Sequence, residues 1–509
     1  MTAFRVRSLI GILALTAGTL VGAVPSSAAG PVVQTDKGAV RGVVTGTSQV
    51  YEGIPYAAPP TGERRWTLPQ PAAAWSGVRD ASKPGAPCAQ LDGTGKALLP
   101  GSKEDCLFLN VTTPGTTGKP RPVMFWIHGG GWSSGTSSDY DGRRLAETGD
   151  VVVVTANYRL GTFGFLGYPG LPDSGTYGLA DQQAALRWVR RNARAFGGDP
   201  DNVTVFGQSA GGLTTCAQLT SPTAGPLMDR AIIESGSCET NFPANGNSPD
   251  SPAKQWWAPR SQIAAAGETA AAKIGCTDLD CLRRADPLEL QTMGDFTQAG
   301  TGTPLLPLDP RKALKTGFFN HVPVMEGNTR DEQGFFGWLY ESDGPMTAAS
   351  YRANLVKSFG NRAAAVEREY RTTGIEAWNA VTTDRGWVCP ALRSSTTMAQ
   401  YGQVYSYSFA DRTAPDVVGF PAGYTPGAYH GSEIAYLFDV GVTLTQQQTE
   451  LSQQMVKYWT NFARSGDPNG VGLPKWPRFH GGATTQALQL NGPASIDLSR
   501  QHHCGFWSR

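Results

Sequence analysis

Short apolar runs alternate along the chain with segments in which apolar residues recur at helical spacing. Runs at 122–127, 151–155, 202–206, 230–234 and 322–325 are candidates for buried strands, and 178–196, 210 onward, 348–372 and 446–464 are candidates for helices. Continuous apolar strands separated by helices are typical of a parallel sheet covered on both faces. We therefore predict an α/β fold with a large, mostly parallel central sheet, flanking helices and long helical insertions.

Composition agrees with a large folded core. Hydrophobic residues make up 40 % of the 509 residues and charged residues 17 %, which excludes a disordered chain, a coiled coil and a collagen. The formal net charge of +1 gives no reason to expect nucleic acid or an acidic membrane as a partner. Length alone would suggest three domains, at about 150 residues each. No break in composition divides 30–509, however, and we predict a single domain there.

The N-terminal 29 residues have the pattern of a secretory signal peptide. Arg5 and Arg7 precede an apolar run over 9–24, and small residues at 25–29 place cleavage after Ala28 or Ala29. A membrane anchor is the alternative, but the run is shorter than the roughly 20 residues of a spanning helix. We expect a secreted protein with no stable membrane anchoring.

Eight cysteines in an exported chain favour disulfide bonds. None of them has the CxxC spacing of a zinc site, and spacing alone does not assign the pairs. We expect no metal and no cofactor.

The motif GxSxG occurs twice, around Ser133 and around Ser209. A nucleophile elbow needs a strand before the serine and a helix after it, because the sharp turn raises the hydroxyl above the sheet. Only Ser209 has both, so we predict that Ser209 is a catalytic nucleophile and that Ser133 lies in a loop. The backbone N–H of Ala210, at the start of the helix, can point at a substrate oxygen.

A second glycine motif, His128 followed by glycines at 129–131, comes directly after the apolar run at 122–127. Consecutive glycines let backbone N–H groups approach the oxyanion of acyl transfer. A phosphate-binding loop is excluded because no Gly-Lys-Ser/Thr follows. The two glycine motifs together predict an α/β-hydrolase.

That fold places an acid and then a histidine after the nucleophile. His430 lies in a polar loop before an apolar run and is the favoured base over the four other histidines that follow Ser209, namely His321, His480, His502 and His503. The acid is expected near 326–332. The pattern does not separate Asp331 from Glu332, since an acid beside Arg330 could also form a surface ion pair.

The chain resembles the type-B carboxylesterase and cholinesterase-like family of α/β-hydrolases over nearly its whole length. The matching segments are 51–60 (YEGIPYAAPP), 104–111 (EDCLFLNV), 157–161 (NYRLG), 196–200 (FGGDP), 206–212 (FGQSAGG) and 458–464 (YWTNFAR) with 466–468 (GDP). The resemblance implies that Glu332 is the triad acid and that Ser235 supports it. It also implies an oxyanion hole made by Gly130, Gly131 and Ala210.

The same resemblance implies further pairs and pocket residues. It implies disulfides between Cys88 and Cys106, Cys276 and Cys281, and Cys389 and Cys504; Cys216 and Cys238 have no general family counterpart, and we expect a fourth bridge between them. It places the aromatic residues Trp132, Phe335 and Phe336 along the substrate gorge, with plain core packing as the alternative.

Two departures from the family pattern bear on the substrate. Gln208 stands where most members carry Glu, and the segment between Cys88 and Cys106 contains no Trp. Both changes remove groups that attract a quaternary ammonium, so an uncharged ester is favoured over a choline ester.

These residues predict a secreted, monomeric serine hydrolase that cleaves small carboxylic esters, with short to medium acyl or aryl groups, through Ser209, His430 and Glu332. Two alternatives remain: a catalytically silent adhesion or binding protein on the same scaffold, and a true lipase. The sequence leaves the acyl length, the alcohol and the natural substrate open.

Overall fold

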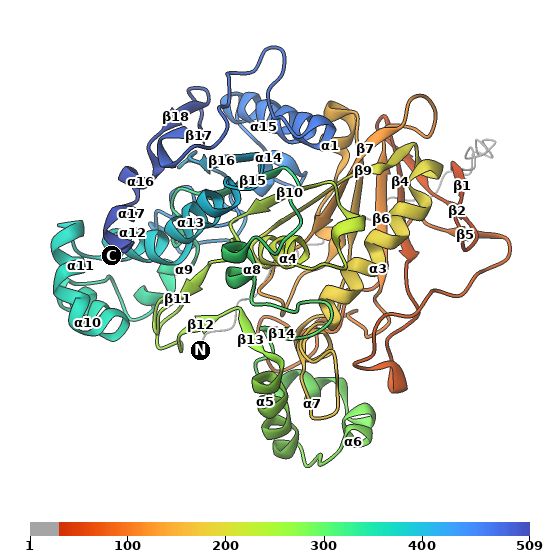
Figure 1. Ribbon diagram of the computed structural model, residues 1–509, viewed down its shortest axis with the longest axis horizontal. Coiled ribbons are helices and arrows are strands. Elements are labelled where there is room, and N and C mark those ends of the chain that lie inside the picture. Colours follow the sequence, from red (N-terminus) through yellow and green to blue (C-terminus); the bar gives the residue numbers. More distant parts are fainter. Residues whose placement is uncertain (1–29, 509) are drawn as a thin grey trace, which may run out of the picture.

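A computed structural model describes residues 30–508, and the predicted signal peptide at 1–29 lies outside this range. An 11-stranded sheet crosses the molecule in the order β18-β17-β16-β15-β10-β9-β7-β8-β6-β4-β3 (Figure 1). Its strands are β3 (Val43–Thr45), β4 (Ser48–Pro55), β6 (Phe108–Thr113), β7 (Arg121–Ile127), β8 (Val152–Ala156), β9 (Gly198–Gln208), β10 (Arg230–Glu234), β15 (Val324–Thr329), β16 (Val404–Phe409), β17 (Thr485–Leu488) and β18 (Ala494–Ile496).

The centre of the sheet is parallel and its margins are antiparallel. Every neighbouring pair from β8 to β17 runs parallel, whereas β3, β4 and β6 at one margin and β18 at the other pair antiparallel. Three small sheets lie outside it: β1 (Val32–Gln34), β2 (Ala39–Arg41) and β5 (Val78–Asp80); β11 (Asn241–Phe242) and β12 (Lys254–Gln255); β13 (Trp257–Pro259) and β14 (Ala299–Thr301).

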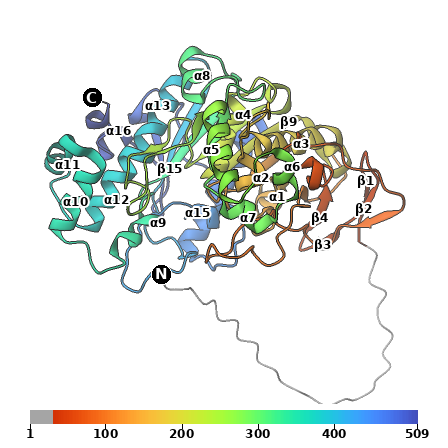
Figure 2. The ribbon, with the colours of Figure 1, turned by 90° about the horizontal axis from the view of Figure 1, so that it is seen from below.

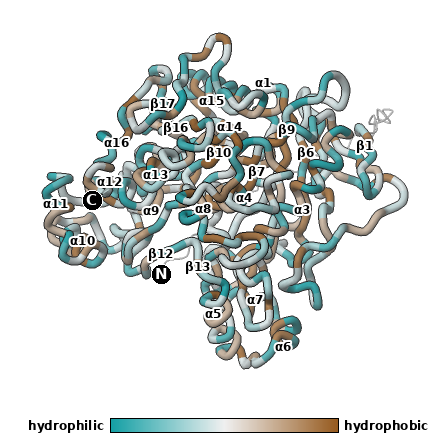
Figure 3. Tube along the Cα trace, in the orientation of Figure 1, coloured by the Kyte–Doolittle hydropathy of each residue, from teal (hydrophilic) through white to brown (hydrophobic). Residues whose placement is uncertain are grey.

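Helices cover both faces of the central sheet. One face packs on α3 (Tyr177–Asn192) and α4 (Ala210–Leu219), and the other on α1 (Arg143–Gly149), α14 (Ile434–Leu437) and α15 (Gln446–Ser465). In Figure 2, α1 and α15 lie below α3 and α4. In β7, Phe125 contributes to the first core and its neighbour Trp126 to the second. Both faces are buried, so after Arg121 this strand is continuously apolar instead of alternating, and hydrophobic residues follow the central strands in Figure 3.

The remaining helices form the insertions and the C-terminus. They are α2 (Gly161–Phe165), α5 (Arg260–Lys273), α6 (Leu279–Arg284), α7 (Pro287–Thr292), α8 (Pro310–Thr316), α9 (Gly334–Gly337), α10 (Ala348–Phe359), α11 (Ala363–Tyr370), α12 (Ile375–Thr383), α13 (Cys389–Met398), α16 (Leu498–Gln501) and α17 (Cys504–Trp507). In Figure 1, α5 to α7 project from one side of the sheet and α10 to α12 from its end. A third apolar cluster joins α10, α11 and α12 to α13 and to the C-terminal helix α17.

The structure changes two of the predicted elements. The strand expected over 322–325 is observed as β15, from Val324 to Thr329. It continues beyond 325 because β10 and β16 pair with its more polar residues, and all six residues of β15 are buried. The loop that carries the candidate acids therefore begins at Arg330. The helix expected over 348–372 is divided into α10 and α11 at Gly360, whose φ of 54° ends the first helix.

All eight cysteines are paired: Cys88–Cys106, Cys216–Cys238, Cys276–Cys281 and Cys389–Cys504. Within 30–508, no helix combines the length and the apolar character that a membrane span requires.

Candidate active site

The order of the strands brings the predicted motifs to one edge of the sheet. After β7 the chain moves to β8 on one side, and β9 then pairs with the other side of β7. In the register of these strands, Ile127 lies opposite Gly207 and Glu234 lies opposite Gln208. The loops that follow β7, β9, β10 and β15 therefore leave the sheet side by side, at the kind of switch point where α/β folds build their sites.

Ser209 forms the turn between β9 and α4. Its backbone has φ 60° and ψ −122°, a region that side-chain-bearing residues rarely occupy. Its N–H donates to the Glu234 carbonyl oxygen at 2.9 Å. A Cβ at Gly211 would lie 2.0 Å from the Ile127 oxygen, and one at Gly236 would lie 2.3 Å from the Ser209 oxygen. Glycine at these two positions is therefore a condition for the close packing that holds Ser209 in this conformation.

The glycine loop after β7 faces Ser209. Gly130 and Gly131 have φ values of 95° and 64°, and within residues 30–508 neither backbone N–H has a hydrogen-bond acceptor. The N–H of Ala210 belongs to the first turn of α4, where helical geometry provides no acceptor either. Three backbone donors at this point are thus free to stabilise an oxyanion.

Buried side chains fix the two ends of this loop. His128 stacks on Tyr158 with ring centroids 4.4 Å apart, and its Nδ1 lies 2.9 Å from the Gly129 oxygen. Burial lowers the pKa of His128 to about 4, so the ring is neutral at physiological pH. Trp132 is fully buried beneath the loop and donates to Thr214 Oγ1 at 2.8 Å. Trp132, the third predicted pocket residue, therefore packs on the first turns of α4 and connects the loop to that helix.

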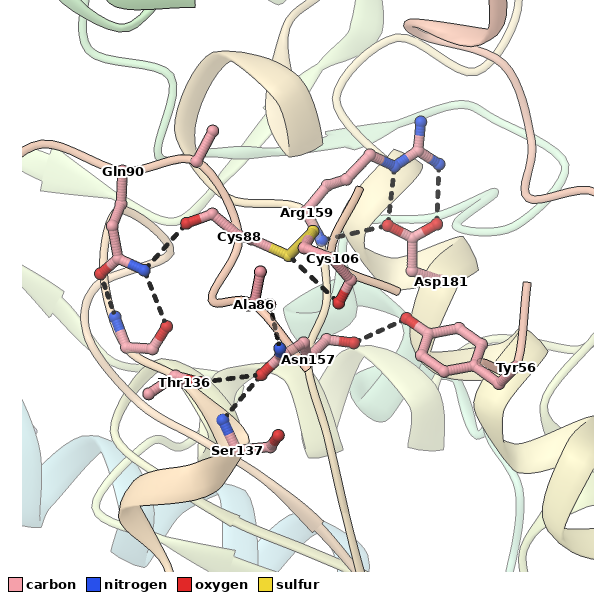
Figure 4. The surroundings of a disulfide bond; sticks show 12 residues. Tyr56, Ala86, Cys88, Gln90, Cys106, Thr136, Ser137, Asn157, Arg159 and Asp181 are labelled. Carbon is pink, nitrogen blue, oxygen red and sulfur yellow. Dashed lines mark hydrogen bonds and ion pairs between the residues drawn. A yellow bond between two sulfur atoms is a disulfide. The ribbon is translucent and has the colours of Figure 1, made fainter. Parts of the chain in front are cut away.

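The segment that follows the loop is tied to the Cys88–Cys106 disulfide region (Figure 4). Gln90 accepts from the Gly135 N–H at 2.8 Å and donates to the Cys88 carbonyl oxygen at 3.0 Å. Asn157 accepts from the Ser137 N–H at 2.8 Å and from Thr136, and it donates to Ala86. These amides connect the segment at 135–137, directly after the glycine loop, to residues 20 to 45 positions away in sequence.

The structure distinguishes the two acids that the sequence left open. Glu332 lies 2.5 Å from His430 Nδ1, whereas Asp331 forms an ion pair with Arg412 at 2.9 Å. Glu332 is fully buried and also accepts from the Thr329 N–H and the Asn328 amide. Burial alone would raise the pKa of Glu332, but the His430 ring and hydrogen bonds from Ser235 and Asn328 hold it below its usual value. Glu332 is therefore ionised at neutral pH.

Two more carboxyl groups are buried near Glu332. The Ser235 hydroxyl lies 3.5 Å from Glu433, and Glu234 accepts from the Trp459 indole at 2.7 Å. Burial, followed by repulsion from Glu332 and Glu234, raises the pKa of Glu433 far above its usual range, and burial raises that of Glu234 to about 8. Both groups keep their proton at pH 7. Ser235, the predicted support of the acid, thus lies between the ionised Glu332 and the neutral Glu433.

The second ring nitrogen of His430, Nε2, contacts the side-chain amide of Gln208. His430 Nε2 lies 3.2 Å from Nε2 of Gln208, and within 30–508 the Ser209 hydroxyl forms no hydrogen bond. Aromatic rings surround the imidazole: the Trp387 centroid is 4.5 Å away, Phe336 5.7 Å and Phe335 5.9 Å.

Ser209, His430 and the three loop glycines line one cavity of about 440 Å³. Most of its remaining wall is apolar or aromatic, formed by Leu213, Trp256, Phe335, Phe336, Trp387, Val417 and Ile434. No Lys, Arg, Asp or Glu lines it. Phe335 and Phe336, two of the predicted pocket residues, line this cavity together with Ser209 and His430. Trp256 and Trp387 come from insertions whose sequence carries no motif, and only the fold brings them here.

The other predicted residues lie elsewhere. Ser133 is exposed and bonds to the Gly130 oxygen. His321 bonds to Gly317 at the surface, His480 is exposed, His502 pairs with Asp384 and His503 with Glu369.

Replacing Glu234 with Gln should change how stability depends on pH. The carboxyl is protonated in the folded state up to about pH 8 but ionises near pH 4.5 in the unfolded chain. The wild type therefore loses stability as the pH rises through this window, and Glu234→Gln does not. The variant should gain on the order of 4 kcal/mol over the wild type between pH 5 and pH 9 in urea unfolding. Its amide oxygen can still accept from Trp459.

The matched control is Glu268→Gln, an exposed position on α5. Its difference from the wild type should be the same at pH 5 and pH 9. Parallel stability curves for Glu234→Gln and the wild type would contradict the assignment of a buried, protonated Glu234.

Known proteins resemble this chain over most of its length. The sequence profile of the Carboxylesterase family matches residues 29–507. A para-nitrobenzyl esterase of Bacillus subtilis is 34 % identical, covering 92 % of this chain and 96 % of its own. Carboxylesterase 1C of Rattus norvegicus is 35 % identical over 91 % and 92 % of the two chains, and an acetylcholinesterase of Bungarus fasciatus is 31 % identical over 97 % and 89 %. The chain therefore belongs to the carboxylesterase family and is a carboxylic ester hydrolase with an α/β-hydrolase fold.

Proposed function

We propose that the protein is a secreted serine esterase that cleaves uncharged carboxylic esters, with short to medium acyl or aryl groups, through Ser209, His430 and Glu332. The observation that carries the proposal is the single cavity onto which Ser209, His430 and the glycine loop open. Its walls hold no carboxylate or basic side chain apart from His430, which favours a substrate without charge.

In the first half of the reaction, Ser209 Oγ attacks the ester carbonyl carbon while its proton passes to His430 Nε2. The carbonyl oxygen becomes an oxyanion and accepts from the N–H groups of Gly130, Gly131 and Ala210, each of which is worth about 3 kcal/mol in comparable sites. Glu332 stabilises the imidazolium through Nδ1. The carbon–oxygen bond to the alcohol then breaks, and His430 returns the proton to the departing oxygen.

In the second half, water attacks the acyl-enzyme. His430 takes a proton from the water, the oxyanion forms again at the same donors, and the ester bond to Ser209 breaks. The carboxylic acid leaves, and Ser209 regains its proton from His430. The reaction needs no group other than these side chains and backbone amides.

Replacing Ser209 with Ala should abolish hydrolysis, since no other group can form the acyl-enzyme. We expect kcat for 4-nitrophenyl butyrate to fall by at least roughly 10⁴-fold. Ser133→Ala is the matched control, because Ser133 lies in the other GxSxG motif, is exposed, and leaves two backbone bonds to the Gly130 oxygen in place. It should keep at least half of the activity. Equal rates for wild type and Ser209→Ala would refute the proposal, as would Ser209-independent labelling by a fluorophosphonate.

Secretion is proposed from the pattern of the first 29 residues and agrees with the four disulfides of the described chain. Protein from the culture medium should begin at Ala29 or Gly30 when its N-terminus is sequenced. A protein that still begins at Met1 would contradict this proposal.

A further inference from the structure

Gln208 occupies an unusual position at the proposed site. It is the last residue of β9, directly before Ser209, and its side chain is buried with 4 % exposure. Its amide contacts the ring of His430, and the two Nε2 atoms lie 3.2 Å apart. Glycines flank the amide on both sides: a Cβ at Gly129 would be 3.3 Å from its oxygen, and a Cβ at Gly431 would be 3.6 Å from its nitrogen.

The protonation state of the ring follows from its other contact. Glu332 is ionised and can only accept, so His430 Nδ1 carries the hydrogen of the 2.5 Å bond between them. In the neutral ring, Nε2 then presents a lone pair, and an amide N–H at 3.2 Å donates to it. The Gln208 amide thus occupies the lone pair that must receive the proton of Ser209.

Proton transfer from Ser209 reverses the hydrogen-bonding role of Nε2 from acceptor to donor. Once Nε2 carries a proton it can only donate, and a fixed N–H donor beside it would be repelled. Gln208 has both a donor and an acceptor at the end of one side chain, and a half-turn about its last torsion exchanges them. Neither a carboxylate, which only accepts, nor an apolar side chain can serve both states of the ring.

We propose that Gln208 is a positioning residue for the base: its amide N–H holds the neutral His430 ring at rest, and its amide oxygen accepts from the imidazolium after Ser209 has lost its proton and until the departing oxygen takes the Nε2 proton. This proposal rests on the proposed function and deepens it. It also means that the Ser209 hydroxyl replaces the amide at Nε2 when a substrate binds.

The charges around His430 make the neutrality of Gln208 significant. Glu332 faces the ring at Nδ1, Glu433 lies three residues along the chain, and Glu234 ends the neighbouring strand β10. Glu433 and Glu234 are protonated at neutral pH because burial raises their pKa values.

The other titratable groups nearby are Glu326, whose pKa burial raises to about 7, and Tyr140 and Tyr429 of the cavity wall, which stay protonated. Glu332 is therefore the full negative charge that directly contacts the imidazole.

Two substitutions test the proposal. Gln208→Glu keeps the length of the side chain but adds a second carboxylate that can only accept, which favours the imidazolium. Because the neutral ring is the active base, the acidic limb of the kcat/KM profile for 4-nitrophenyl butyrate should move up by about one pH unit. At a pH on the acidic side of both midpoints, kcat/KM should therefore be about tenfold lower than in the wild type.

Gln208→Met removes both hydrogen-bonding groups at nearly constant volume, and kcat should fall about tenfold while KM stays within twofold.

A readout that does not depend on activity accompanies the kinetics. In protein labelled with ¹³C-histidine, the NMR titration midpoint of the His430 imidazole should rise by about one unit in Gln208→Glu. This measurement keeps the two proposals apart: a wild type that hydrolyses no ester would refute the proposed function, while the titration would still test the contact. Gln447→Glu, an exposed position on α15, is the charge-matched control and should leave both the kinetic limb and the midpoint in place.

The proposal is overturned if the kinetic limb and the His430 midpoint of Gln208→Glu coincide with those of the wild type. It is also overturned if a folded Gln208→Met, verified by its thermal unfolding, keeps the wild-type kcat. If Gln208→Met does not fold, the titration of Gln208→Glu decides.

Discussion

The sharp turn at Ser209 is the constraint on which the rest of the site depends. The strand β9 ends and the helix α4 begins within one residue, whose φ of 60° and ψ of −122° are strained for a residue with a side chain. Glycine at 211 and 236 lets the backbones of β7, α4 and the segment after β10 meet closely enough to hold that conformation. The hydroxyl of Ser209 and the free N–H groups of the helix therefore point to one side, where the glycine loop after β7 adds its own donors.

The same close packing around Ser209 also determines which of the buried carboxyl groups nearby is ionised. The segment that accepts the Ser209 N–H continues into Ser235, which lies between Glu332 and Glu433. Of the three carboxyl groups Glu234, Glu332 and Glu433, only Glu332 has a basic partner, and burial keeps the other two protonated at neutral pH. His128, buried at the start of the glycine loop, is neutral as well. One negative charge faces one imidazole, next to a cavity whose walls contain no other formal charge.

Local patterns in the sequence predicted the parts of the site that the backbone forms. A strand, a glycine-rich turn and a helix are consecutive in the chain, so Ser209 and the loop at 128–131 could be found from a few neighbouring residues. The order nucleophile, acid, histidine along the chain, together with its polar loop, then favoured His430 among the five histidines that follow Ser209. Asp331 and Glu332 could not be separated in this way, because they are adjacent and differ only in which of them faces His430 once β15 has paired on both sides.

Other features depend on contacts between distant segments. Trp387 contacts the imidazole from a π-helical turn at Asp384–Val388, and nothing near it in sequence indicates this. Gln208 adjoins Ser209 in the motif, but its partner His430 is 222 residues away in sequence. The burial of Trp132 beneath the loop follows from its positive φ of 60° and from its bond to α4. The full length of β15 was missed because its second half is polar, and only its two neighbouring strands explain why it is buried.

The central claim is that the turn at Ser209 and the glycine loop form one oxyanion site. A crystal structure of the protein after reaction with a 4-nitrophenyl alkylphosphonate, which leaves a tetrahedral phosphorus on the nucleophile, tests it most directly. We expect phosphorus bonded to Ser209 Oγ, with the phosphoryl oxygen within about 3 Å of the N–H groups of Gly130, Gly131 and Ala210. Phosphorus on another residue, or a phosphoryl oxygen turned away from these three donors, would contradict it.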